Sequence, residues 1–315
     1  RDKINEVQEI CGCARVDLVA HSMGGLVARQ YIQSDKYEDD IDQLIFLGTP
    51  HLGAPKAYLM WEGGDFGSTI IDSAFEFLYK REAKKAGFNS LFDYVQNRPI
   101  TSIQELLPVY DYLFENNILR DYPSGYPQNI FLEDIRSSMG SLLSSGVEIT
   151  NIMGDAGAFS TNISMNVAPS DSLPLWENGE PTLIILGFGD GTVPLSSAAN
   201  INSGLLNIAS IHRRLPTDAE GVVFKKLTGK DASILIDRPL FPSIKLIILK
   251  ILSPVDVLVT APDGKKIGKD FVTNQEINEI ENAFYSGFLT DNEYITIPDP
   301  LDGEYQIQTQ GTGSG

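Results

Sequence analysis

The sequence is short of positive charge. Lysine and arginine together number 24 against 42 aspartates and glutamates, so the 315 residues carry a formal net charge of −18. A chain this acidic repels the phosphates of nucleic acids and of anionic membrane surfaces, so neither is expected to be its main partner. Long apolar runs are missing as well. Without 18 consecutive apolar residues, no transmembrane helix is expected.

Cysteine and histidine are also rare. The two cysteines, Cys11 and Cys13, are separated by a single residue, which is too short a spacing for a relaxed disulfide. No further ligands accompany them to indicate a zinc site. We therefore interpret them as two small apolar residues at a turn. The three histidines are His21, His51 and His212, so few candidates exist for a catalytic base.

One stretch near the start of the chain joins a strand, a tight turn and a helix. The apolar run at residues 16–20 predicts a buried strand, and apolar residues recur at helical spacing from Gly24 onward. Between them, Ser22 is flanked by the small residues Ala20 and Gly24, which allow strand and helix to approach closely. This is the nucleophile-elbow pattern G-x-S-x-G with alanine in the first glycine position. It predicts Ser22 as a nucleophile and the backbone N–H of Met23 as an oxyanion donor; the alternative is a serine that only caps a helix.

Two carboxylates are candidates for the acid that would orient a histidine. Asp190 lies in a glycine-rich turn, residues 187–194, which follows a strand predicted at residues 182–186. Asp155 follows another predicted strand, residues 148–154. A carboxylate at either place is suited to hold an imidazole in the tautomer that activates a serine.

The base is sought among the three histidines. His212 follows a short strand predicted at residues 205–210 and precedes a helix, which gives the order Ser, Asp, His. His21 adjoins Ser22, and neighbouring side chains at the end of a strand point apart. His51 follows a different strand and is expected to shape the floor of a pocket. The pattern therefore favours His212 as the base.

Four motifs together resemble one family of enzymes. They are Ala-His-Ser-Met-Gly-Gly at residues 20–25, Gly-Thr-Pro-His-Leu-Gly-Ala-Pro at 48–55, Leu-Leu-Pro at 106–108 and Gly-Asp-Gly-Thr-Val-Pro at 189–194. In this order they resemble the α/β-hydrolases, and more narrowly the lecithin:cholesterol acyltransferase-like branch of lipases and acyltransferases. The resemblance covers about residues 1–230. It implies that Asp190 is the acid, with Ser22 as nucleophile and His212 as base.

Residues 55–145 interrupt the alternation of strands and helices. Between residues 58 and 131 lie 15 of the chain's 29 phenylalanines, tyrosines and tryptophans. These aromatics either fill a small core of their own or line an apolar groove over Ser22. We expect a lid that takes an acyl chain, with Trp61 and Phe66 as candidates to line its groove.

The predicted architecture has two parts. Residues 1–238 form an α/β domain, the α/β-hydrolase parallel sheet with its N-terminal strands missing and with lid helices over residues 70–78 and 106–114. Residues 239–315 change to β-branched alternation and tight turns. That pattern predicts a small all-β sandwich domain that stops one strand short. No set of catalytic residues is found in this second part.

These features predict a serine-nucleophile acyl hydrolase, a lipase or esterase that acts on lipid esters through an acyl-enzyme. The alternatives are an O-acyltransferase, which passes the acyl group to an alcohol, and a catalytically silent surface or binding protein on the same fold. No metal or cofactor is required. The expected partner is a lipid or other ester, met in transient contact with a lipid interface. The protein is expected to be secreted or held at a bacterial cell surface.

The start of the sequence carries one more expectation. Only one helix, residues 1–10, precedes the strand at residues 16–20, whereas the usual fold has several strands ahead of its nucleophile. One edge of that strand is therefore expected to be unpaired and apolar. The chain is expected to be N-terminally incomplete, poorly soluble and weakly active.

Overall fold

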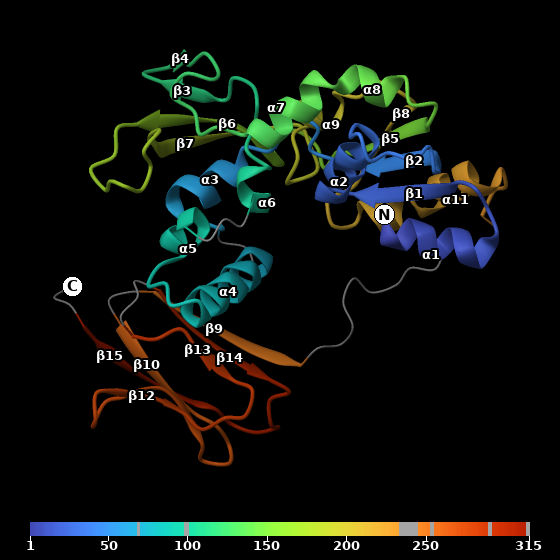
Figure 1. Ribbon diagram of the computed structural model, residues 1–315. Coiled ribbons are helices and arrows are strands. Elements are labelled where there is room, and N and C mark those ends of the chain that lie inside the picture. Colours follow the sequence, from blue (N-terminus) through green and yellow to red (C-terminus); the bar gives the residue numbers. More distant parts are fainter. Residues whose placement is uncertain (68–69, 98–100, 233–244, 253–254, 289–291, 313–315) are drawn as a thin grey trace. The chain divides into compact units, whose positions relative to one another are not determined.

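The computed structural model describes residues 1–67, 70–97, 101–232, 245–252, 255–288 and 292–312 (Figure 1). The chain divides into two compact units. The first, called here the α/β unit, comprises Arg1–Gly63 and Pro99–Arg238, and the second, the sandwich unit, comprises Gly64–Arg98 and Pro239–Gly315. The predicted boundary between residues 238 and 239 lies outside the described residues. The middle of the predicted lid belongs to the sandwich unit, which the sequence-based division does not anticipate.

Four parallel strands form the central sheet of the α/β unit, in the order β1-β2-β5-β8. Their bounds are β1 Val16–His21, β2 Ile41–Leu47, β5 Glu148–Gly154 and β8 Leu205–Ile208. β1 lies at one edge, because among the described strands it pairs with β2 alone. The α/β class and the parallel sheet are thus confirmed.

Helices cover both faces of the central sheet (Figure 1). Side chains along β2 alternate between the two faces: Leu44 and Phe46 join a core with α1 and α2, whereas Ile45 and Leu47 join a core with α10 and α11. Burial on both faces is typical of a parallel strand and explains the continuous apolar run. These helices are α1 Asp2–Cys11, α2 Met23–Ile32, α10 Leu215–Asp218 and α11 Glu220–Thr228.

A second sheet in the α/β unit has the order β4-β3-β6-β7. β3 and β6 are parallel and the other two pairs are antiparallel. The strand predicted at residues 182–186 is β7, so the strand that precedes Asp190 lies outside the central sheet. The strands are β3 Leu113–Glu115, β4 Ile118–Leu119, β6 Thr161–Ala168 and β7 Glu180–Gly187. The remaining helices of the unit are α3 Lys56–Gly63, α6 Thr101–Gln104, α7 Ile130–Ser137, α8 Met139–Leu143 and α9 Leu195–Ala198.

Several aromatic residues of the predicted lid fill a core between α3 and the second sheet. Tyr58, Tyr112 and Tyr126 are buried there with leucines, a methionine and a valine, and Trp61 packs against them. The helix predicted over residues 106–114 is wrong: α6 ends at Gln104 and β3 begins at Leu113. Pro108 explains the difference, because proline inside a helix removes a backbone donor and clashes with the preceding turn.

The sandwich unit consists of two antiparallel sheets and two helices. The sheets have the orders β12-β11-β10-β15 and β13-β14-β9, and they enclose a core that includes Val257, Ile267 and Ile295. The all-β sandwich is therefore confirmed. Its elements are α4 Ile70–Lys85, α5 Leu91–Asn97, β9 Leu246–Leu252, β10 Val255–Thr260, β11 Lys266–Asp270, β12 Gln275–Asn278, β13 Phe284–Tyr285, β14 Asn292–Pro298 and β15 Gln306–Gly311.

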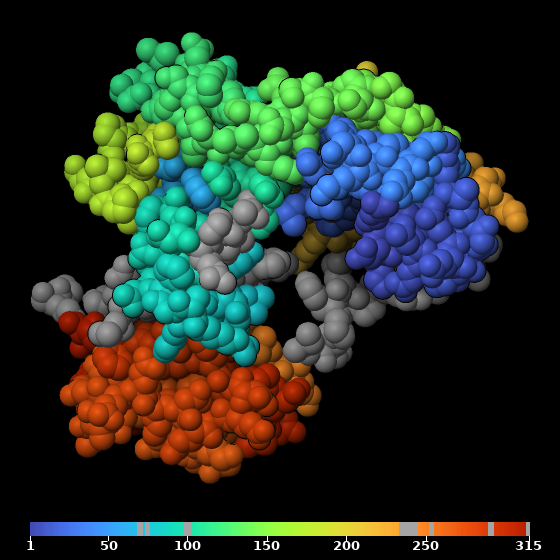
Figure 2. All heavy atoms as spheres, viewed as in Figure 1, coloured from blue at the N-terminus to red at the C-terminus, as the bar shows by residue number. Residues whose placement is uncertain are grey.

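α4 confirms the helix predicted at residues 70–78, but it packs on the sandwich (Figure 2). The hydroxyl of Tyr294 on β14 donates to Oε2 of Glu76 at 2.6 Å. The ammonium of Lys80 lies 4.5 Å from the centre of the Tyr294 ring, and the rings of Phe77 and Phe284 are 5.0 Å apart. Contacts with the C-terminal strands, far away in sequence, thus hold this helix.

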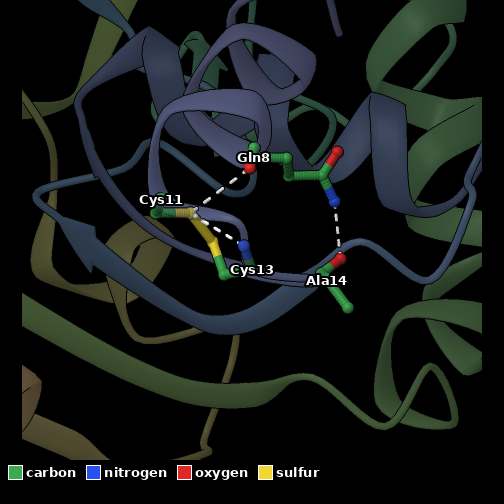
Figure 3. Close-up of a disulfide and its surroundings, with 4 residues drawn as sticks. All are labelled: Gln8, Cys11, Cys13 and Ala14. Atoms are coloured by element: carbon green, nitrogen blue, oxygen red, sulfur yellow. Dashed lines mark hydrogen bonds between the residues drawn. A yellow bond between two sulfur atoms is a disulfide. The ribbon is translucent and has the colours of Figure 1, made fainter.

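The two cysteines form a disulfide, contrary to the sequence-based interpretation (Figure 3). Gly12 between them has φ 64° and ends α1 in the left-handed conformation that glycine adopts readily. That turn brings the Cα atoms of Cys11 and Cys13 to 5.2 Å, a normal separation for a disulfide. The short spacing appears prohibitive only when the conformational freedom of Gly12 is left out.

Candidate active site

Ser22 lies at the turn between β1 and α2, where the sequence predicts an elbow. Its backbone has φ 56° and ψ −130°, a conformation that residues with a Cβ rarely adopt and that concentrates at functional sites. Its N–H donates to the carbonyl O of Leu47 at 2.8 Å, and its own carbonyl accepts from the N–H of Gly25 at 3.0 Å. The turn is tied to the neighbouring strand and to the helix, which fixes the position of the Ser22 hydroxyl.

The structure brings together all three side chains predicted to form a triad. Oγ of Ser22 lies 2.8 Å from Nε2 of His212. Nδ1 of the same ring lies 2.6 Å from Oδ2 of Asp190. Asp190 is buried, so the imidazole stands between a shielded carboxylate and a partly exposed hydroxyl. When Nδ1–H donates to the carboxylate, Nε2 is left free to accept the serine proton.

The loop after β7 holds the carboxylate of Asp190 in place. Oδ1 accepts from the backbone N–H groups of Thr192 at 3.0 Å and Val193 at 2.8 Å, which leaves Oδ2 for His212. The rival candidate, Asp155, instead accepts from the N–H of Gly157 at 2.8 Å and closes its own turn. The geometry therefore places Asp190, and not Asp155, beside His212.

Two glycines at strand ends, neither of them among the predicted site residues, make room for this acid–base pair. Gly154 is the last residue of β5, and a Cβ atom there would lie 2.8 Å from Cβ of Asp190. Gly48 directly follows β2, and a Cβ there would lie 3.0 Å from Oδ2 of Asp190. A glycine at the carboxyl end of adjacent parallel strands is the sequence signal that marks both.

The small residue that permits the close approach of α2 is Gly25, not Gly24. A Cβ atom on Gly25 would overlap the side chain of Thr49 and lie 2.8 Å from the ring of Phe46, whereas one on Gly24 would meet nothing within 4 Å. The elbow pattern correctly indicates a tight junction. It assigns the contact to the wrong glycine, because the first turn of α2 directs Gly25 toward β2.

Met23 is the first residue of α2, immediately after Ser22. The first N–H groups of a helix have no partner within the helix, and the helix dipole adds partial positive charge at this end. The N–H of Met23 is therefore suited to bind a negatively charged oxygen formed on a substrate held at Ser22.

The other two histidines occupy different environments. Nε2 of His21 lies 2.9 Å from the backbone O of His212, so this residue belongs to the site although it is not among the predicted site residues. His51 is fully buried beside Arg29, and burial together with the guanidinium charge lowers its pKa well below the usual value. A neutral, buried His51 supports the turn after β2 from within the protein.

A cavity of about 270 Å³ in the α/β unit is lined chiefly by Val19, Leu47, Pro216 and Phe224, on the α11 side of the sheet. Phe66, a groove candidate, packs against Tyr79 in the sandwich unit.

Within the described ranges, no cluster of three or more His, Cys, Asp and Glu side chains could hold a metal ion. None of the described helices combines the length and apolarity needed to cross a membrane.

A family model described as a PGAP1-like alpha/beta domain matches residues 2–86. That range contains β1, Ser22, α2 and β2. Over residues 2–86 the protein is thus similar to an α/β-hydrolase-type domain. The α/β-hydrolase resemblance of its motifs is thus confirmed.

Solved structures similar to the chain are distant. The Bacillus licheniformis lipase BlEst2 in its propeptide form is 13% identical over 99% of this chain and 60% of that one, with a TM-score of 0.40. The mature form of BlEst2 is 14% identical over 72% of this chain and 70% of that one, with a TM-score of 0.37. A chain of the Tle4–Tli4 complex is 16% identical over 66% of this chain and 56% of that one, with a TM-score of 0.39. The chain thus spans 60% of the length of the propeptide form of BlEst2. No curated protein matches it.

Proposed function

We propose that the protein is a serine acyl hydrolase, a lipase or esterase that cleaves esters through an acyl-enzyme. The observation that carries this proposal is the hydrogen-bond chain from Oγ of Ser22 through the ring of His212 to Asp190, with steps of 2.8 and 2.6 Å. The strained backbone of Ser22, with its positive φ, and the similarity of the surrounding residues to an α/β-hydrolase-type domain support the same function.

The geometry suggests the order of steps. Oγ of Ser22 attacks the ester carbonyl while Nε2 of His212 takes the serine proton. The carbonyl oxygen becomes an oxyanion, which the N–H of Met23 stabilises, and Asp190 stabilises the imidazolium. His212 then gives the proton to the leaving alkoxide, and an alcohol departs from the acyl-enzyme. His212 then takes a proton from a water molecule, which attacks the acyl carbonyl; the bond to Oγ breaks, the carboxylic acid leaves, and His212 returns the proton to Oγ of Ser22.

The class of substrate and the compartment are part of the proposal. We propose a lipid ester as the substrate, with transient contact at a lipid interface; the net charge of −18 disfavours nucleic acid as a partner. The Cys11–Cys13 disulfide supports an oxidising environment such as the outside of a cell.

Labelling with a fluorophosphonate probe tests the proposal. The probe should phosphonylate Oγ of Ser22 with loss of fluoride, and mass spectrometry of the digested protein should locate the adduct. Ser22→Ala should fold but remain unlabelled. Labelling that persists in Ser22→Ala, or a folded wild-type protein that is never labelled, would contradict the proposal and favour a binding protein.

A second measurement separates hydrolysis from acyl transfer. Short- and long-chain nitrophenyl esters are turned over in water alone and with a long-chain alcohol added. A hydrolase releases mainly free acid in both media. An acyltransferase instead gives a new ester as the main product when the alcohol is present.

A further inference from the structure

His21, the last residue of β1, lies against His212. Nε2 of His21 is 2.9 Å from the backbone O of His212, and the centres of the two rings are 4.7 Å apart with 37° between their planes. A carbonyl only accepts hydrogen bonds, so Nε2 of His21 carries the proton and donates it. The residue beside the nucleophile thus contacts the loop that carries the base.

This contact completes a pair of hydrogen bonds on the backbone of His212, called here the clamp. On one side, the N–H of His212 donates to the backbone O of Asp190 at 2.7 Å. On the other side, the carbonyl of His212 accepts from His21. With both backbone groups held, the direction of the side chain is set before any substrate binds, which favours alignment of Nε2 with Ser22 and of Nδ1 with Asp190.

The protonation state of His21 is compatible with its position beside His212. Burial and the neighbouring His212 lower the pKa of His21 below its usual value, while the backbone O of His212 and the carboxylate of Asp190 act in the opposite direction. His21 is therefore neutral at neutral pH. A charged His21 would oppose the imidazolium that His212 becomes during catalysis, and the neutral ring avoids that repulsion.

We propose that His21 is a positioning residue, which holds the backbone of His212 through its Nε2–H so that the base faces Ser22. This inference rests on the proposed function for its kinetic consequence, but the clamp itself is a property of the fold. His21 touches no reacting atom and acts only through His212.

Two substitutions of His21 distinguish the effect of its hydrogen-bond donor from the effect of its ring. His21→Phe keeps a flat ring and removes the donor, whereas His21→Gln has an amide nitrogen near the place of Nε2. Loss of one such hydrogen bond corresponds to about a 3- to 10-fold change in rate. We expect His21→Phe to lower both kcat/KM and the rate of fluorophosphonate labelling by about that factor, and His21→Gln to stay within about 3-fold of wild type. Asp17→Asn, at an exposed position of the same strand, serves as the matched control.

One readout distinguishes positioning from general support of the fold. The downfield proton resonance of Nδ1–H of His212 should broaden in His21→Phe and persist in His21→Gln. Thermal melting checks that each variant is folded.

The outcomes are distinct. A His21→Phe protein with wild-type rate and resonance would overturn the inference, as would equal losses in His21→Phe and His21→Gln that follow a lower melting temperature. If wild type is never labelled at Ser22, the proposed function fails. The resonance of His212 in the two variants then still decides whether His21 positions it.

Discussion

A Cβ atom on Gly48 would lie 3.0 Å from Oδ2 of Asp190 and 3.3 Å from Nδ1 of His212. The side chains of Asp190 and His212 thus pack against the backbone at the end of β2, where Gly48 has no side chain. Gly48 also has φ 57°, in the left-handed region where glycine is favoured. The close approach and the backbone conformation both require glycine at this position.

Substitution of Gly48 by alanine should therefore damage the site more than the fold. The added methyl group crowds Asp190, Leu215 and His212, and we expect kcat/KM to fall by about 10-fold or more, with a loss of about 1–2 kcal/mol in the free energy of unfolding. The matched control is Gly229→Ala, because Gly229 has φ 69° but nothing within 4 Å of its Cβ position. That variant should lose comparable stability and keep its rate. Equal rates in both variants would show that Gly48 is not needed to position Asp190 and His212.

The choice between the two candidate acids can be tested in the same assay. Asp190→Asn leaves the shape of the loop but removes the charge that stabilises the imidazolium and selects its tautomer. In a serine protease the corresponding change lowers kcat by about 10⁴, and we expect a loss of similar order here. Asp155→Asn should stay within about 3-fold of wild type, because this carboxylate only closes a turn. A larger effect at Asp155 than at Asp190 would reverse the assignment.

The central part of the site is predictable from the sequence because it is local. A buried strand, a strained serine and an amphipathic helix follow one another within about 20 residues, and the motif around Asp190 is equally compact. His212 follows by elimination, since only three histidines exist. The parallel sheet and the β-sandwich are also visible as apolar periodicity, so their fold classes are confirmed.

Features that depend on distant contacts are not predictable in this way. The packing of α4 depends on Tyr294, more than 200 residues away, and the sheet that receives β7 depends on its pairing with β6. The contact of His21 with His212 likewise joins residues 191 positions apart. The disulfide is the exception: it is local, and it is missed because the turn at Gly12 has to be known first.

The tight junction of β1 and α2 gives a prediction about two adjacent glycines. A methyl group on Gly25 overlaps Thr49 and crowds Phe46, so Gly25→Ala should lower the free energy of unfolding by about 1–3 kcal/mol. Gly24→Ala meets open space in the first turn of a helix and should be neutral or stabilising by up to about 1 kcal/mol. Urea unfolding, followed by the fluorescence of the two tryptophans, measures both. If Gly24→Ala is the more damaging change, the assignment of the contact to Gly25 is incorrect.

The core of the sandwich unit contains a carboxylate, Glu293, whose pKa is raised. Glu293 on β14 is buried, and its Oε2 accepts from the hydroxyl of Tyr285 at 2.7 Å and from the N–H of Val257 at 3.3 Å. Asp256, paired with Lys269 at 2.6 Å, lies close by. Burial and the Asp256 carboxylate raise the pKa of Glu293 to about 7 from the usual 4.5.

A raised pKa means that the folded unit keeps a proton that the unfolded chain releases. The stability that this proton contributes is fully present below pH 4.5 and is lost as the pH rises toward 7. Glu293→Gln cannot ionise, so relative to wild type it should gain about 1–3 kcal/mol between pH 4 and pH 8. Hydrogen exchange of amides in β10 and β14, corrected for intrinsic rates, measures this difference in the intact chain. The exposed Glu281→Gln should show no such trend, and a Glu293→Gln difference that is flat from pH 4 to pH 8 would show that Glu293 titrates alike in the folded and unfolded chain.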